Sequence, residues 1–177
     1  MAMRFGENKK SFLIDLSADP FVVPPGFEVV EHIKGDFLNW IPNRPPIELY
    51  LTPDQRKGIV EGAKLLEDLD KYEGTMANAN ALDYLFEHLT AAPWIIPDDW
   101  KNVEQHRSKH ILFWGTRYRH EGSLCVRTLE WNADAREQVW RTGYCWIDNR
   151  MNSQFPAAMV RKQAPAPAPP APAKAEA

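Results

Sequence analysis

Cysteine is scarce in this 177-residue chain, which contains only Cys125 and Cys145. Each thiol falls within an apolar run of strand-like character, so a disulfide between two facing strands is one interpretation. The first 15 residues, however, contain no apolar run long enough for a signal peptide. We therefore expect a cytoplasmic protein in which both cysteines are free and buried.

Long hydrophobic runs and nucleotide-binding motifs are also missing. No stretch approaches the roughly 18 apolar residues that cross a bilayer, so we expect no membrane association. The chain has no Gly-x-x-x-x-Gly-Lys loop for phosphate and no Gly-x-Ser-x-Gly nucleophile elbow. These absences predict no cofactor, and they rank a small enzyme third among the functions that remain.

Ligand spacing typical of a structural metal site is absent as well. His106 and His110 stand four residues apart and, joined by Cys125 and Cys145, would complete a Cys₂His₂ set. Neither cysteine belongs to a Cys-x-x-Cys pair, which is the short spacing that tight zinc sites show. We predict no metal centre and keep zinc binding by these four residues as the alternative.

The most informative feature that is present is a tract from His110 to Ile147 in which aromatic residues and arginines interleave. Apolar residues that recur with a period of two indicate strands. Gly122 lies where a tight turn needs a positive φ. We predict three antiparallel strands over residues 111–119, 124–131 and 138–147.

Two helices are predicted ahead of this tract. Thr52 caps the first one and Gln55 completes a capping box with it. The apolar spacing extends this helix over about 20 residues, to a stop at Gly74. Asn80 caps the second helix, in which apolar residues recur at i, i+3, i+4 and i+7 until Pro93 ends it.

The order of these signals predicts an α+β fold, with two helices packed on a three-stranded antiparallel, aromatic-rich sheet. The proline-punctuated segment up to Pro46 is expected to wrap this core. We assign residues 1–10 to a flexible N-terminus and residues 11–163 to a single α+β domain. Residues 164–177, which are Ala and Pro apart from Lys174 and Glu176, are predicted to form a disordered tail.

Three blocks of the chain match a known pattern: Asn78-Ala-Asn-Ala-Leu-Asp-Tyr-Leu85, Ile96-Pro-Asp-Asp-Trp-Lys101 and Phe113-Trp-Gly-Thr116. In these blocks, and across residues 12–160 in general, the chain resembles a family of short, uncharacterised bacterial proteins. The resemblance implies one compact domain of bacterial or phage-like origin. The family has no assigned activity, so the resemblance implies no catalytic residue.

Charge is distributed unevenly along the chain. Residues 1–100 hold 9 Lys and Arg against 17 Asp and Glu, whereas residues 101–163 hold 11 against 6. A basic second half suggests a polyanionic partner. The alternative is that the two halves of the chain attract each other.

These observations favour a non-catalytic interaction module that binds a macromolecular partner, in the first place a protein. The alternative is a nucleic-acid-binding protein, because arginines neutralise phosphates and exposed aromatic rings stack on bases. Sequence alone leaves open the oligomeric state and the face of the sheet that is exposed. The residues predicted to form the binding surface are Arg117, Arg119, Arg127, Trp140, Arg141 and Tyr144.

Overall fold

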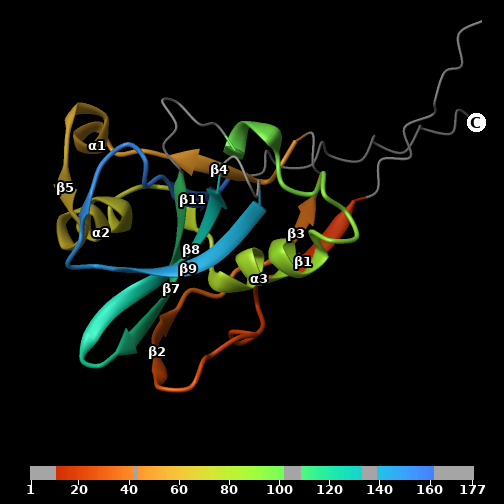
Figure 1. Cartoon of the computed structure of the whole chain (residues 1–177), viewed down its shortest axis with the longest axis horizontal. Helices are drawn as coiled ribbons and strands as arrows, with labels where there is room; N and C mark the ends of the chain where they lie inside the picture. The colour runs from red at the N-terminus through yellow and green to blue at the C-terminus, as the bar shows by residue number, and fades with distance from the viewer. Residues whose placement is uncertain (1–10, 42–43, 102–108, 133–138, 162–177) are drawn as a thin grey trace, which may run out of the picture.

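The computed structural model describes residues 11–41, 44–101, 109–132 and 139–161, and within them the protein is mostly β (Figure 1). These residues form eleven strands, three short α-helices and one 3-10 turn. The expected α+β fold of two helices on a three-stranded sheet is therefore wrong. The predicted flexible N-terminus (1–10) and Ala/Pro tail (164–177) lie outside the described residues.

The proline-rich N-terminal segment accounts for much of this difference, because it and the residues directly after Pro46 supply four strands where a wrapping was expected. Its prolines fall between the strands, where a missing N–H removes no hydrogen bond from a ladder. β1 and β3 pair in a separate two-stranded sheet, whereas β2 and β4 join the main sheet. The bounds are β1 Phe12–Asp15, β2 Phe27–His32, β3 Phe37–Trp40 and β4 Ile47–Tyr50.

The main sheet has seven strands, in the order β4-β11-β7-β8-β9, with β2 alongside β7 and β6 alongside β11. Every pairing in it is antiparallel except that of β11 with β7. The three predicted strands are confirmed as β7, β8 and β9, but they form only one side of this larger sheet. The bounds are β6 Thr75–Met76, β7 His110–His120, β8 Ser123–Asn132, β9 Val139–Trp146 and β11 Ala157–Val160.

The turn between β7 and β8 has the predicted backbone. Glu121 and Gly122 both have positive φ, at 49° and 85°. Two successive residues with positive φ give the turn a twist that matches the twist of paired strands. The resulting hairpin projects away from the helices, with β2 beside it (Figure 1).

The first predicted helix is divided in two. The capping box of Thr52 and Gln55 is present, but α1 (Pro53–Lys57) ends at Gly58. A short strand, β5 (Val60–Glu61), then pairs with β10 (Arg150–Met151) before α2 (Gly62–Asp70) begins. Glycine is a poor helix former, and pairing with β10 gives the intervening backbone an alternative to the helix.

The second predicted helix begins slightly earlier than expected. α3 spans Ala79–His88, with Asn78 in place of Asn80 at its N-cap. Both asparagine side chains bond instead to the N-terminal segment, as described below. The helix therefore starts at a residue that tertiary contacts select.

Both faces of the main sheet are covered. On one face, α3 and the β1–β3 pair contribute to a core that includes Leu82, Phe113 and Trp140. On the other face, α2 contributes to a second core that includes Leu65 and Trp114. Successive residues of a strand point to opposite faces, so the neighbours Phe113 and Trp114 enter different cores. This arrangement explains why the beginning of β7 is continuously apolar.

β7 changes its neighbour at Gly115. It pairs with β11 before this residue and with β2 after it. The Gly115 N–H donates to the Ala77 carbonyl oxygen (3.0 Å), and the Gly115 carbonyl oxygen accepts from the Ile33 N–H (2.7 Å). A Cβ atom at Gly115 would lie 2.6 Å from the Met76 carbonyl oxygen. The crossing of these backbones therefore requires glycine.

We expect Gly115→Ala to lower the free energy of unfolding by about 1–3 kcal/mol, because the methyl group must displace backbone. Gly58→Ala is the matched control, since a Cβ there meets no atom within 4 Å. Its effect should stay within about 0.5 kcal/mol. Urea unfolding followed by tryptophan fluorescence measures both. Equal effects of the two substitutions would contradict the packing argument.

Candidate functional site

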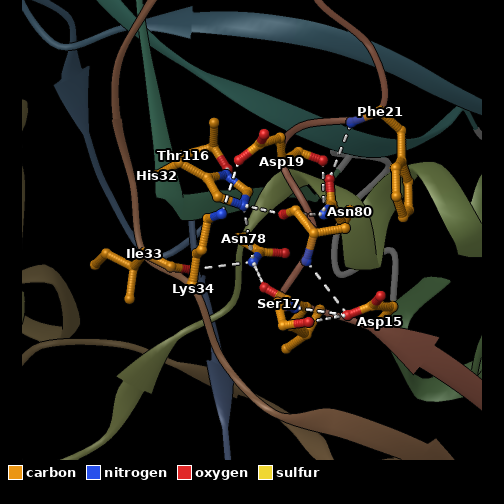
Figure 2. Close-up of polar contacts among 12 residues, drawn as sticks. Asp15, Ser17, Asp19, Phe21, His32, Ile33, Lys34, Asn78, Asn80 and Thr116 are labelled. Atoms are coloured by element: carbon orange, nitrogen blue, oxygen red, sulfur yellow. Dashed lines mark hydrogen bonds and ion pairs between the residues drawn. The ribbon is translucent and has the colours of Figure 1, made fainter.

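A polar network joins the N-terminal segment to α3 and β7, and it centres on His32 (Figure 2). His32 Nε2 lies 3.0 Å from the Ala18 carbonyl oxygen, and Nδ1 lies 2.8 Å from Thr116 Oγ1. Because a carbonyl oxygen only accepts, Nε2 carries the ring proton. In a neutral ring Nδ1 then accepts, so the Thr116 hydroxyl donates to it, while Thr116 Oγ1 accepts from the Ala79 N–H (2.9 Å). This pattern is satisfied by neutral histidine.

The electrostatics around His32 favour the same neutral form. Burial lowers the pKa of His32 below its ordinary value, and the nearby positive charge of Lys34 acts in the same direction. The Ala18 carbonyl and the carboxylate of Asp19 oppose this shift. Asp19 is itself paired with Lys34, at 2.8 Å. Both ring nitrogens of His32 are engaged in hydrogen bonds, which leaves neither available as a general base.

Two asparagines complete the network from the start of α3. Asn78 Nδ2 donates to the Leu16 carbonyl oxygen (2.9 Å). Asn80 Nδ2 donates to the Ala18 carbonyl oxygen (3.1 Å), and its Oδ1 accepts from the Phe21 N–H (3.1 Å). These are side-chain bonds to backbone, so they set the path of the N-terminal segment over α3. We interpret the network as a structural clasp.

The four residues considered for zinc do not come together. His106 lies outside the described residues. Cys125 and Cys145 fall on neighbouring residue pairs of the β8–β9 ladder and therefore point to opposite faces of the sheet. His110 Nδ1 lies 3.3 Å from Glu130 Oε1. Across residues 11–41, 44–101, 109–132 and 139–161, no group of three or more His, Cys, Asp and Glu side chains is placed to hold a metal.

Both thiols are free and buried, which confirms the prediction made from the sequence. Burial raises the pKa of the Cys125 thiol to about 11 and also raises that of Cys145. A buried, protonated thiol is a weak nucleophile. Neither cysteine is therefore a candidate for nucleophilic catalysis.

Two of the predicted binding arginines lie against β2. Arg117 forms an ion pair with Glu31, and Arg119 Nη1 lies 3.3 Å from Glu28 Oε2. Pairing of β2 with the end of β7 brings these side chains together. Neither glutamate was predicted as a partner from the sequence, although the acidic surplus of the first half was a signal for them. The side chain of Arg117 is largely buried, whereas that of Arg119 is partly exposed.

Three more of the predicted residues face the side of the sheet that α3 covers. Arg127 forms an ion pair with Asp83 of α3, and the two side chains are only 8% and 9% exposed. Burial nevertheless raises the pKa of Asp83, because desolvation outweighs the attraction of the guanidinium group. Tyr144 is half-buried with its ring 5.9 Å from the Arg127 guanidinium carbon, and Trp140 is buried. Arg141, the sixth predicted residue, is exposed on β9.

Ion pairs between side chains of the two halves of the chain are a common feature of these contacts. Arg117, Arg119 and Arg127 pair with acidic residues of the first half, and Arg161 Nε lies 3.8 Å from Glu48 Oε2. The uneven charge of the sequence therefore corresponds, at these residues, to attraction between the halves. The predicted aromatic and cationic surface is for the most part engaged within the molecule.

The outer backbone of β9 has no strand partner among the described residues. β9 ends the strand order of the main sheet. The Ile147 N–H donates to the Leu124 carbonyl oxygen (2.9 Å), so the odd-numbered residues of β9 bond to β8. By the alternation of an antiparallel ladder, the even-numbered residues direct their N–H and C=O groups outward. Among the described residues, no hydrogen bond reaches these outward groups at Thr142 and Tyr144.

This edge lacks most of the features that usually block strand addition, although it carries one charged side chain, Arg141. β9 contains neither proline nor lysine, its pairing with β8 has no bulge, and it extends over eight residues. Val139 and Trp146, near its two ends, are each 36% exposed. The opposite edge is β4, which has four residues and follows Pro45 and Pro46. β2 also ends the sheet, beyond β7, but it has six residues and its pairing shifts register between Val29 and Glu31. β9 is therefore the longest regular edge among the described strands, a property that no local sequence signal reveals.

Comparison with known proteins supplies no functional residue. The chain matches no protein-family model, no curated protein and no solved structure. The resemblance to uncharacterised bacterial proteins stays a prediction. In the part of the chain that the structure describes, no helix is long and apolar enough to cross a membrane.

The clasp predicts a pH dependence of stability. The pKa of His32 is lowered in the folded protein, so the unfolded chain, with a value near 6.5, takes up a proton first as the pH falls. The stability that neutral His32 contributes is complete above the pKa of His32 in the unfolded chain. It is lost as the pH falls towards the pKa of His32 in the folded protein. We expect His32→Gln to melt at a lower temperature than the wild type at about pH 7.5. Below that pH, its melting temperature should vary less with pH than that of the wild type. Melting temperatures of the wild type and the variant that fall in parallel as the pH decreases would contradict this.

The buried ion pair predicts a strong coupling between its two members. Arg127→Met leaves the Asp83 carboxylate buried without a counter-charge, which should cost about 3–5 kcal/mol of unfolding free energy. Adding Asp83→Asn to this variant removes the unpaired charge and should recover part of the loss. Chemical unfolding of the two single variants and the double variant measures the coupling. Strictly additive effects would show that the pair contributes no interaction.

Proposed function

We propose that this protein is a non-catalytic interaction module that binds a protein partner by adding a strand along β9. The observation that carries the proposal is the unpaired, regular edge of β9, with outward backbone groups at Thr142 and Tyr144. An extended segment that pairs with such an edge gains main-chain hydrogen bonds and covers the side chains at its ends. Natural sheets protect long free edges, so an unprotected one favours a site that a partner covers.

The contacts of the arginines weigh against the nucleic-acid alternative. Arg117, Arg119 and Arg127 each have an acidic partner within the chain. To bind phosphate, these guanidinium groups would have to exchange an existing ion pair for a new one. The aromatic side chains Trp140 and Tyr144 are buried and half-buried, which limits stacking on bases. No observation on the described residues favours nucleic acid over protein.

Proline at position 142 tests strand addition directly. Thr142→Pro removes an outward N–H and leaves the bonds between β9 and β8 in place, so a protein partner should be lost. Thr142→Val keeps the N–H and the branched shape, and it should retain the partner. The measurement is retention of proteins by the immobilised wild type and the two variants, each first shown to fold by circular dichroism.

Salt separates the proposal from its alternative. Main-chain hydrogen bonds are neutral, so retention should persist from about 0.1 to 1 M NaCl, whereas contacts to phosphates weaken steeply over this range. Partners that Thr142→Pro and Thr142→Val retain equally would exclude β9 as the binding edge. Tight, salt-sensitive binding of single-stranded DNA or RNA would favour the alternative.

A further inference from the structure

We propose that the strand that pairs with β9 is β9 of a second copy of the chain, in antiparallel orientation, with the twofold axis at Gly143. This inference rests on the proposed function, because it names the partner of the same edge. A pairing of this kind joins two seven-stranded sheets into one continuous sheet. It is isologous, so each residue of one copy meets the symmetry-related residue of the other.

Hydrogen bonding restricts the register of such a dimer. The even-numbered residues of β9 direct their backbone groups outward, so they must face even-numbered residues of the second copy. In a twofold pairing this condition places the axis on a residue and never between two residues. The central candidates are therefore Arg141, Thr142 and Gly143.

Side chains select among these three registers. An axis at Arg141 places two guanidinium groups directly opposite each other, which is destabilising. An axis at Thr142 leaves the exposed Trp146 beyond the paired stretch. An axis at Gly143 pairs residues 140–146 and so covers the exposed Trp146, which meets the second strand at residue 140. Trp140 is buried in the core of its own copy, so the gain comes from covering Trp146.

The backbone at the axis suits glycine. Residue 143 would face its own copy in a pair without direct hydrogen bonds, where the two Cα atoms approach to about 4.5 Å. Two glycines meet there without side chains to clash. Within one molecule there is also little space for a side chain at residue 143, since a Cβ would lie 3.1 Å from Thr128 Oγ1 and 3.2 Å from Glu130 Oε1.

Charge offers little resistance to this association. Arg141 is the only ionised residue of β9, and in this register it faces the uncharged Cys145 of the second copy. The formal net charge of the whole chain is only −3, so long-range repulsion between copies is small. The strand therefore meets its own copy without a like-charge contact.

Mass measurement in solution tests the dimer. An interface built on one strand from each side falls at the small end of protein interfaces, so light scattering after size exclusion should cover about 1–200 µM protein. The wild type and Thr142→Val should approach twice the chain mass as concentration rises, and Thr142→Pro should stay monomeric. Hydrogen exchange of the wild type adds a test without substitution: the amides of Thr142 and Tyr144 should become protected as dimer forms.

Cysteine variants test the register. Under mild oxidation, Gly143→Cys should form a disulfide-linked dimer, because residue 143 faces its own copy at a distance that a disulfide spans. Thr142→Cys is the matched control, since residue 142 then faces Tyr144 and should not cross-link. The two native cysteines are buried in the wild type.

The outcomes separate this inference from the proposed function. A wild type that stays monomeric at every concentration, but loses another protein partner on Thr142→Pro, would overturn the self-pairing and leave the strand addition. A dimer that Thr142→Pro does not affect would overturn both. Cross-linking through Thr142→Cys in place of Gly143→Cys would overturn the axis at Gly143.

Discussion

The junction at Gly115 and Thr116 in β7 is the constraint on which the rest of the structure depends. Backbone from the N-terminal segment and from the start of α3 converges there, on Gly115 through its N–H and C=O and on Thr116 through its hydroxyl. Only a residue without a side chain permits the approach at Gly115. Next to it, one hydroxyl links neutral His32 to the first N–H of α3. The junction allows β7 to pair with β11 and β2 in turn, and so allows a sheet of seven strands.

Electrostatics ties the two halves of the chain to each other across this framework. The acidic side chains come from β2, α3 and β4, and the arginines come from β7, β8 and the end of β11. The pair of Arg127 with Asp83 is the most buried of these, and it anchors α3 to the sheet. A chain that satisfies its cations internally in this way has fewer of them to offer a polyanion. Backbone at the sheet edge then becomes the more informative surface for function.

Sequence patterns predicted the three strands of the aromatic tract, the turn at Gly122 and the capping box of Thr52 and Gln55, because each depends on neighbours within a few residues. The prediction of one long helix after Thr52 was wrong, because the competing pairing of β5 with β10 involves residues about 90 positions apart. For the candidate site, sequence identified β9 and its aromatic residues. It did not identify Arg127 and Trp140 as interior residues, because burial depends on what α3 covers.

The sequence by itself determined the alternation that makes β7, β8 and β9 strands and the charge imbalance between the halves. These follow from local periodicity and from composition. Only the tertiary structure decided that β1 pairs with β3, that the arginines pair with acids of the first half, and that β9 ends the main sheet with the backbone groups of Thr142 and Tyr144 directed outward. Strand order and edge position depend on contacts between distant residues, which no local pattern encodes.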